Sequence, residues 1–174
     1  MKKEYLECGK VCSAHGVRGF LKIEPWCDSP KVLAMQKRVF FVEKDGSYRE
    51  VRVLSASVSG ARLVLMLLEG IESREAAQAE KNRTLYLHRS DIPLEDGAVL
   101  IADMIGLPVI DVDSGRVYGK LTEVNDGVQA KLYTVATENG DVLLPGVPEF
   151  IKEIDTERGV FVRPIPGFFR DDEI

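Results

Sequence analysis

The sequence predicts an all-β fold of two small β-barrels, joined by a short linker and carrying one or two short helices. Short apolar segments recur at spacings of about 8–12 residues between turn residues, as in small barrels. The charge changes sign at a polar, proline-containing segment near residue 90. The length of 174 residues suits either one large domain or two small ones. The short strand spacing and the change in the sign of the charge favour two.

The two halves of the chain differ strongly in charge. Residues 1–90 contain 16 Lys and Arg against 11 Asp and Glu, a net charge of +5. Residues 91–174 contain 7 against 17, a net charge of −10. The basic half is suited to nucleic acid, whereas the acidic half is suited to a basic protein and should repel phosphate. The alternative is a solvated surface on which the charges are simply uneven.

Strands are expected in the first half at 6–12 and 19–25, where Leu21 and Ile23 alternate with polar residues. A short helix follows Ser29, because serine is a good N-cap and proline suits the first helical position. Further strands are expected at 38–42, around Val51 and Val53, and at 63–68, where unbroken apolar character predicts burial on both faces. Asp45-Gly46 and Ser59-Gly60 mark the turns between them.

A second helix is expected at 73–81, with Ser73 as N-cap and Glu75 near the positive end of the helix dipole. Its apolar residues are alanines, so it can cover a barrel end. A strand at 85–87 then closes the first barrel, which we place at residues 1–90. The polar segment 89–97, with its proline and glycine, is the expected linker.

The second barrel is placed at residues 97–170, and the pattern predicts a small closed sheet because closure removes exposed edges. The turn signals are Asp113-Ser114-Gly115, Asn125-Asp126-Gly127, Asn139-Gly140 and Arg158-Gly159. The strands are expected at 105–110, 118–124, 132–136, 142–144, 151–154 and 160–163. Residues 170–174 are expected to form a loose tail.

The segment His15-Gly16-Val17-Arg18-Gly19 lies between the first two strands and is the main candidate binding loop. Gly16 and Gly19 allow a sharp bend, which would lift Arg18 from the sheet surface. A guanidinium group held in this way suits phosphate or carboxylate. The alternative is an ordinary strand connection with a solvated arginine.

Metal and nucleophile motifs were tested by their spacing. Cys8, Cys12, His15 and Cys27 lack the tight Cys-x₂-Cys knuckle of a zinc site, and Cys8 and Cys12 on a straight strand would lie about 13 Å apart. The segment 111–115 begins like a calcium loop but has its glycine one position early and Thr122 in place of the required glutamate. No nucleophile, phosphate-loop or dinucleotide motif is found. The sequence therefore predicts a binding protein without cofactor, metal or catalytic residues.

Two features bear on location and on partners. The first residues lack the apolar segment of a secretory signal, and three cysteines argue against a disulfide framework, so a cytoplasmic protein is expected. Of the C-terminal aromatic residues, Phe161 is expected in the core. Phe168 and Phe169 are adjacent, so one of them could face a partner.

Several segments resemble the RimM family of bacterial ribosome maturation factors, in order and over nearly the whole chain. Gly9-Lys10-Val11, His15 to Lys22 and Asp28-Ser29-Pro30 resemble its N-terminal signature, and Ser73 to Ala77 its short helix. Asp103 to Val109 resembles the opening of its second domain, a PRC barrel, and Leu143-Leu144-Pro145 and Pro166-Gly167-Phe168 match later landmarks.

The resemblance implies a monomeric assembly factor and not an enzyme. It would bind the immature small (30S) ribosomal subunit at its head, assist maturation of the head rRNA and contact small-subunit ribosomal protein S-nineteen. It supports His15, Gly16, Arg18 and Gly19 as a functional loop and points to the start of the second barrel. An enzymatic barrel that binds a cofactor or metal is the alternative function.

The sequence departs from the family just before Asp103. Many members carry an aromatic cluster there that is implicated in subunit binding, whereas this chain has Val99, Leu100 and Ile101. An apolar anchor can still form, but stacking on a base is lost. Leu100, Ile101 and Phe168 are the expected anchors for a protein partner.

Overall fold

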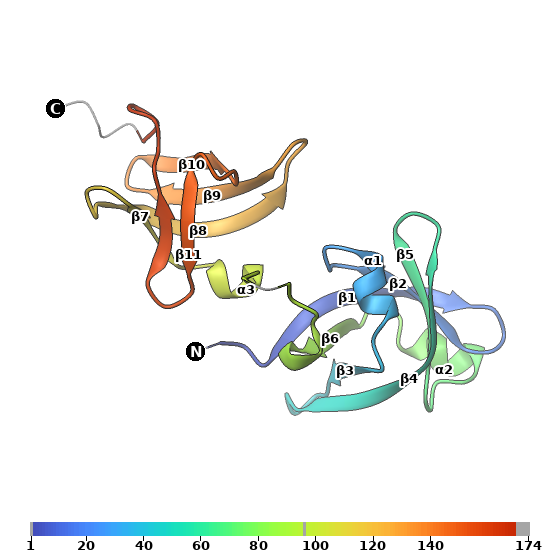
Figure 1. Cartoon of the computed structure of the whole chain (residues 1–174). Helices are drawn as coiled ribbons and strands as arrows, with labels where there is room; N and C mark the ends of the chain where they lie inside the picture. Colours follow the sequence, from blue (N-terminus) through green and yellow to red (C-terminus); the bar gives the residue numbers. More distant parts are fainter. Residues whose placement is uncertain (1, 96, 170–174) are drawn as a thin grey trace. The chain divides into compact units, whose positions relative to one another are not determined.

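The strands predicted from apolar alternation form two separate six-stranded sheets in a computed structural model of the chain (Figure 1). The structure describes residues 2–95 and 97–169. The chain divides into two units, Met1–Pro93 and Leu94–Ile174. The prediction of an all-β chain with two domains and a few short helices is confirmed. The tail expected at 170–174 lies outside the described residues.

The first unit is a closed barrel with the strand order β1-β2-β5-β4-β3-β6. Closure depends on β1, which pairs with β6 through its first half and with β2 through its second half. The strands are β1 (Tyr5–His15), β2 (Phe20–Pro25), β3 (Arg38–Val42), β4 (Tyr48–Ser59), β5 (Leu63–Leu68) and β6 (Thr84–His88).

Alternate residues of these strands fill the barrel. In β5, Val64, Met66 and Leu68 are fully buried, whereas the leucines between them are only partly buried. The prediction that 63–68 is buried on both faces is therefore wrong for one face, because a closed barrel has a single interior and the other face of β5 lies on its outside. The other fully buried residues of this core include Val11, Leu21, Ile23, Phe41, Leu85 and Leu87.

The two short helices predicted in the first half are present, and each adds one buried residue to this core. The side chain of Ser29 accepts a hydrogen bond from the Lys31 N–H (3.3 Å) and caps α1 (Pro30–Ala34). Ser73 accepts from the Ala76 N–H (3.1 Å) and caps α2 (Arg74–Ala79). Leu33 and Ala77, one from each helix, are fully buried in the barrel core.

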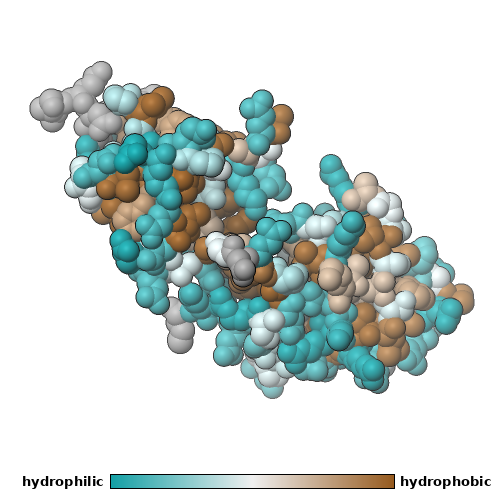
Figure 2. All heavy atoms as spheres, in the orientation of Figure 1, coloured by the Kyte–Doolittle hydropathy of each residue, from teal (hydrophilic) through white to brown (hydrophobic). Residues whose placement is uncertain are grey.

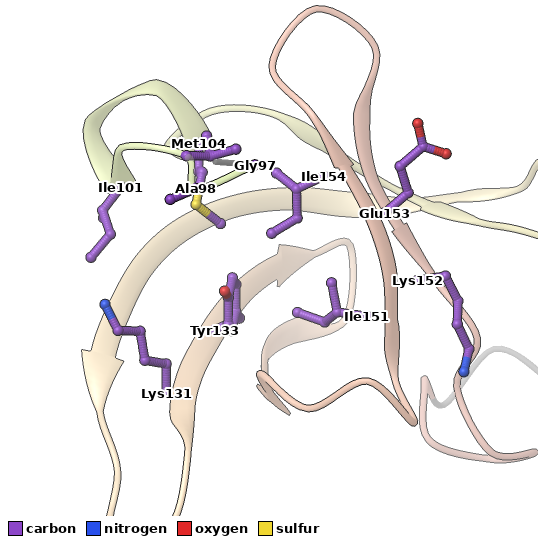
Figure 3. Close-up of a pocket in the computed structure, with 11 residues that line it drawn as sticks. Gly97, Ala98, Ile101, Met104, Lys131, Tyr133, Ile151, Lys152, Glu153 and Ile154 are labelled. Atoms are coloured by element: carbon purple, nitrogen blue, oxygen red, sulfur yellow. The ribbon is translucent and has the colours of Figure 1, made fainter. Parts of the chain in front are cut away.

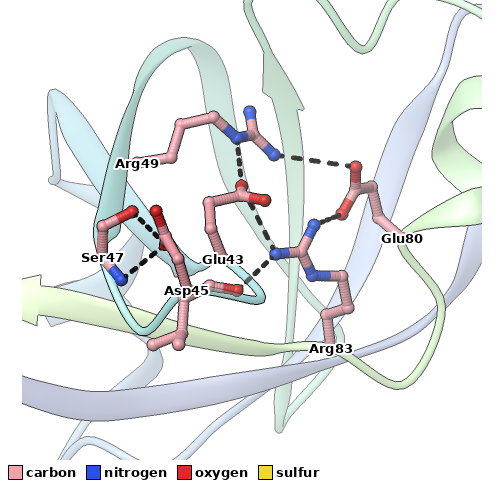
Figure 4. Close-up of polar contacts among 7 residues, drawn as sticks. Glu43, Asp45, Ser47, Arg49, Glu80 and Arg83 are labelled. Atoms are coloured by element: carbon pink, nitrogen blue, oxygen red, sulfur yellow. Dashed lines mark hydrogen bonds and ion pairs between the residues drawn. The ribbon is translucent and has the colours of Figure 1, made fainter.

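A network of two arginines and two glutamates fixes the β3–β4 hairpin to the segment between α2 and β6 (Figure 4). Arg83 pairs with Glu80 (2.8 Å) and donates to the Val42 carbonyl oxygen (2.7 Å). Arg49 pairs with Glu43 (2.6 Å), and this hydrogen bond lowers the pKa of the Glu43 carboxyl. Both guanidinium groups also lie over the Phe41 ring, at 4.7 and 5.4 Å from its centroid.

The first part of the predicted linker is attached to the first barrel. Arg89–Asp91 forms a 3-10 helix, η1, and the Arg89 N–H bonds to the Glu4 carbonyl oxygen (2.7 Å). Arg38 donates two hydrogen bonds to the Asp91 carboxylate (2.7 and 3.1 Å). Within 89–97, the described residues from Leu94 onward belong to the second unit.

The second unit is a sheet with the order β10-β9-β8-β7-β12-β11, in which β12 and β7 are parallel and the other neighbours antiparallel. The predicted closure is not met by hydrogen bonding, because β10 and β11 are the two ends of the ladder. The elements are α3 (Ile101–Met104), β7 (Pro108–Asp111), β8 (Val117–Asp126), β9 (Lys131–Thr137), β10 (Gly140–Pro145), β11 (Ile151–Asp155) and β12 (Gly159–Val162).

Two local predictions in this unit are wrong. The strand expected at 105–110 begins only at Pro108, because the Leu107 N–H bonds back to Met104 (3.1 Å) and Gly106 takes a φ of +90°. Asn125 and Asp126 still belong to β8, and the turn follows them, closed by a bond from the Gly127 N–H to the Ala130 carbonyl oxygen (3.0 Å).

The second core is mainly aliphatic and contains two buried aromatic residues, Tyr133 and Phe169. Phe169 is buried and stacks on Tyr118 with ring centroids 4.1 Å apart. Phe161 was expected in the core but is only partly buried, because its neighbours Val160 and Val162 point inward and it points outward. The Arg158 guanidinium covers its ring at 4.8 Å from the centroid.

The segment that resembles a calcium loop is a turn organised by Asp111. One carboxylate oxygen accepts the N–H groups of Asp113 and Ser114 (2.8 Å each), and the other accepts the Tyr118 hydroxyl (2.7 Å). These hydrogen bonds, that of Tyr118 foremost, lower the pKa of Asp111 to about 2. Both oxygens of the carboxylate therefore accept hydrogen bonds from residues 113–118.

Limited proteolysis should cut the chain first within residues 93–97. Pro93 to Glu95 and Gly97 are exposed, whereas Arg89–Asp91 is bonded to the first barrel. Mass spectrometry of the first fragments measures the site. First cleavage inside either sheet would contradict two independently stable units with the predicted boundaries 1–90 and 97–170.

Asp111 should titrate at a pH of about 2 in a carboxyl NMR titration. Because folding lowers the pKa of Asp111, its carboxylate stabilises the folded protein at pH values above the ordinary pKa of 3.8. This stabilisation is lost as the pH falls through the lower pKa of the folded state. Tyr118→Phe keeps the stacked ring but removes the hydroxyl donor, so it should raise the pKa of Asp111. An unchanged pKa in this variant would contradict the assigned cause.

Candidate functional site

The candidate loop is the tip of the β1–β2 hairpin. His15 pairs with Phe20 as the last pair of the ladder, and Gly16 and Gly19 have φ values of +69° and +86°. His15, Val17 and Arg18 are exposed, Val17 to 79%. The predicted bend is therefore present, and the side chains of His15, Val17 and Arg18 are exposed on it.

The two glycines act in different ways. A Cβ on Gly16 would meet no atom within 4 Å. A Cβ on Gly19 would lie 2.6 Å from the Ser73 nitrogen and 2.7 Å from the Ile71 carbonyl oxygen, which is closer than real Cβ contacts come. Gly19 is buried, so it positions the loop against the turn before α2 and offers no surface itself.

Arg18 has no hydrogen bond or ion pair to any described residue, which leaves its exposed guanidinium group available. The packing of Gly19 against Ser73 also brings the start of α2 beside the loop. Arg74, the first residue of α2, is exposed and likewise unpaired within the described chain. Sequence reasoning missed Arg74 because only the approach of the two backbones reveals its position.

Sequence reasoning also missed an aromatic cluster on the outside of the first barrel. Tyr5 and Tyr48 are stacked at 3.9 Å, and Tyr86 contacts Tyr48 edge to face at 5.3 Å. The buried Phe40 contacts Tyr5 edge to face, with ring centroids 5.0 Å apart. The residues come from four different strands, so no local sequence pattern signals the cluster. Its ring contacts link β1 to the β3–β4 hairpin.

Two of the expected protein anchors lie at α3 in the second unit. Leu100 precedes the helix and Ile101 begins it, and both are partly buried. Ile101 lines a pocket of about 370 Å³ together with Tyr133 and Ile154 (Figure 3). The other labelled lining residues include Met104, Ile151, Lys131, Lys152 and Glu153.

Phe168, the third expected anchor, lines a different pocket. It is partly buried, 5.2 Å from the Phe150 ring, and its pocket of about 310 Å³ is formed with Asp141 and Val142 of β10. The structure therefore assigns Ile101 and Phe168 to two pockets of the second unit.

Apolar side chains reach the surface of both units, as the brown areas among the teal in Figure 2 show. In the second unit they include Leu143 at 59% exposure and Val128, which is fully exposed at the tip of the β8–β9 hairpin. Isolated exposed apolar residues are normal, so only those next to a pocket or to an available charge are considered as contact sites.

Two of the three cysteines, Cys8 and Cys27, have thiols that burial keeps protonated. Burial raises the pKa of the Cys8 thiol, and burial followed by the nearby Asp28 raises that of Cys27 to about 11. Both are therefore protonated at neutral pH, whereas nucleophiles and metal ligands act as thiolates. Among the described residues, no group of three or more His, Cys, Asp or Glu side chains could hold a metal ion.

None of the helices in the described ranges combines the length and apolar character that a membrane span requires.

Family models match almost the whole chain. Residues 6–92 match the model of the RimM N-terminal domain, and residues 101–168 match that of the RimM PRC barrel domain. A protein named ribosome maturation factor RimM from Symbiobacterium thermophilum is 35% identical over 98% of this chain and 97% of the relative. One from Oleidesulfovibrio alaskensis is 32% identical over 94% of each.

The chain is also similar to two solved structures. A 16S ribosomal RNA processing protein RimM from Pseudomonas aeruginosa is 22% identical, covers 92% of this chain and 98% of its own, and has a TM-score of 0.46. The N-terminal domain of RimM from Thermus thermophilus is 25% identical, covers 53% and 98%, and has a TM-score of 0.42.

The two loop glycines provide a matched test. Gly16→Ala should lower the free energy of unfolding by about 1 kcal/mol, the cost of a left-handed residue in open space. Gly19→Ala adds a backbone clash and should cost at least about 2 kcal/mol more. Urea unfolding measures both. Equal losses would show that the contact with the turn before α2 does not constrain the loop.

Proposed function

The chain belongs to the RimM family of ribosome maturation factors, and from this membership we propose that it binds the immature small ribosomal subunit at its head. There it assists maturation of the head rRNA and incorporation of small-subunit ribosomal protein S-nineteen. It acts as a monomer in the cytoplasm and works by binding, with no catalytic step and no cofactor.

The observation that supports the rRNA contact is Arg18, exposed and without a partner among residues 2–95 and 97–169, on a hairpin tip that is bent at two glycines. Arg74 adds a second available cation at the start of α2. Arginine forks suit phosphate oxygens, and phosphate contacts supply much of the affinity for RNA. The net charge of +5 over residues 1–90 assists the approach. In this proposal His15 and Gly16 belong to the contact surface and Gly19 positions it.

The second unit is proposed to contact S-nineteen. Residues 91–174 have a net charge of −10, which opposes phosphate and favours a basic protein. Charge mainly raises the association rate, so the interface also needs apolar anchors. The anchors that we assign are Ile101 in the pocket at α3 and Phe168 in the pocket beside β10, with the half-buried Leu100 next to Ile101.

Sucrose-gradient sedimentation tests the proposal. The full-length protein should travel with immature small subunits and be largely absent from mature ones. A protein that remains at the top of the gradient in lysates containing immature subunits would contradict subunit binding.

Arg18→Ala should weaken binding to immature subunits by about 1–3 kcal/mol, the value of a charge-assisted contact. Its melting temperature should not change, because Arg18 bonds to no described residue. Co-sedimentation and thermal unfolding measure the two effects.

Arg62→Ala is the matched control. Arg62 is also exposed and unpaired within the described chain, but it lies in the β4–β5 turn, at the opposite end of β5 from the segment that packs on Gly19. It removes the same charge from the same unit. If both variants weaken binding equally, the effect is one of net charge, and the loop has no specific role.

A further inference from the structure

The second unit has an unusual free sheet edge at β10. The only strand hydrogen-bonded to β10 is β9, and no backbone hydrogen bond among the described residues joins 141–145 to any other strand. The six residues of β10 pair with β9 in continuous register, with no bulge. One row of backbone N–H and C=O groups therefore faces outward along a regular strand.

Natural proteins protect such edges with lysines, prolines, bulges or a covering segment, because a free edge can pair with another chain. The opposite edge, β11, has two of these devices: Lys152 and a register shift between Ile151 and Glu153. β10 carries no lysine, and its one proline, Pro145, stands at its last position. Among residues 97–169, none pairs with the outer edge of β10, whereas the β11 edge is protected.

Side chains on both sides of β10 favour one kind of partner. On its outer side, Asp141 and Leu143 are exposed, Leu143 to 59%, and Glu138 is exposed in the adjoining turn. Lys120, the cation on the same outer row, is two strands away, opposite Ala136 of β9. A strand added at the free edge therefore meets carboxylates and a leucine on that side.

On its inner side, β10 borders the pocket of about 310 Å³ that contains Phe168. The pocket is also lined by Val142, Tyr118 and Phe169, with Thr137, Asn139 and Asp141 at its polar part. A side chain entering from the edge would pack against Val142 and the Phe168 ring.

We propose that β10 accepts an extended segment of a basic protein as an added strand of the sheet. Backbone hydrogen bonds along the edge would give affinity, and alternate side chains would give specificity, as in other cases of strand addition. The segment has apolar residues at the positions that face the pocket and lysine or arginine at those that face Asp141 and Glu138. This inference rests on the proposed function, in which that partner is S-nineteen.

Hydrogen exchange of the full-length protein, free and with purified S-nineteen, tests the inference. Every second amide from Asp141 to Leu144 should exchange at least about tenfold more slowly in the complex, because edge amides acquire acceptors. Amides of β11 should not change. Binding with protection elsewhere and none in β10 would overturn strand addition but leave S-nineteen as partner. Absence of binding would overturn both.

Asp141→Lys and Glu149→Lys form a matched pair of charge reversals. Glu149 is exposed in the loop between β10 and β11 and lies outside the proposed edge site. Asp141→Lys should weaken binding of S-nineteen at least about tenfold, and Glu149→Lys less than about threefold. Equal losses of affinity in the two variants would show that only long-range electrostatic attraction is involved, and they would overturn the edge site. A free protein that sediments as a dimer with β10 already protected would show that a second copy occupies the edge.

Discussion

The first barrel depends on the way β1 bends between its two neighbours. Register shifts lie on both sides of Gly9, one in the ladder with β6 and one in the ladder with β2. Such irregularities bend a strand and increase its twist, which lets one strand close the sheet on itself. At Gly9 a Cβ would lie 2.7 Å from the Glu24 carbonyl oxygen, so the close approach of β2 requires glycine there. The hairpin tip at 15–19 extends from the far end of this strand, and its position depends on the closure.

Features encoded by neighbouring residues could be predicted from the sequence. Ser29 and Ser73 cap their helices because the cap acts over two or three residues, and Gly46 and Gly60 adopt the expected positive φ values between strands. Features that depend on distant residues could not. The outer aromatic cluster combines four strands, and the available cation at Arg74 is recognised only once Gly19 is seen against Ser73. For the same reason the outer face of β5 was predicted as buried, since an apolar run does not reveal that its sheet closes around a single interior.

The two units differ in whether their sheets have free edges. In the first, the pairing of β1 with β6 removes every edge, and the ion pairs around Arg83 hold the strands that complete the ring. In the second, the ladder ends at β10 and β11, and β7 begins only at Pro108 because Gly106 and Leu107 form a turn after α3. A closed barrel can offer only side chains and hairpin tips to a partner, whereas an open ladder can also offer its backbone. The first unit therefore suits contact through a projecting cation and the second suits contact through a strand.

Net charge over a whole unit is a poor guide to where a partner binds on it. The second unit is acidic in sum, yet the described lining of the pocket at Ile101 contains Lys131 and Lys152 against a single carboxylate, that of Glu153. The β10 edge, by contrast, has Asp141 and Glu138 with the nearest cation of its outer row two strands away. Dissolved salt screens the attraction between exposed charges beyond about 8–10 Å. The charged groups close to a surface therefore decide whether it attracts a basic segment. The same acidic unit therefore combines an apolar pocket at α3 whose described charges are mainly basic with a strand edge whose nearest charges are acidic.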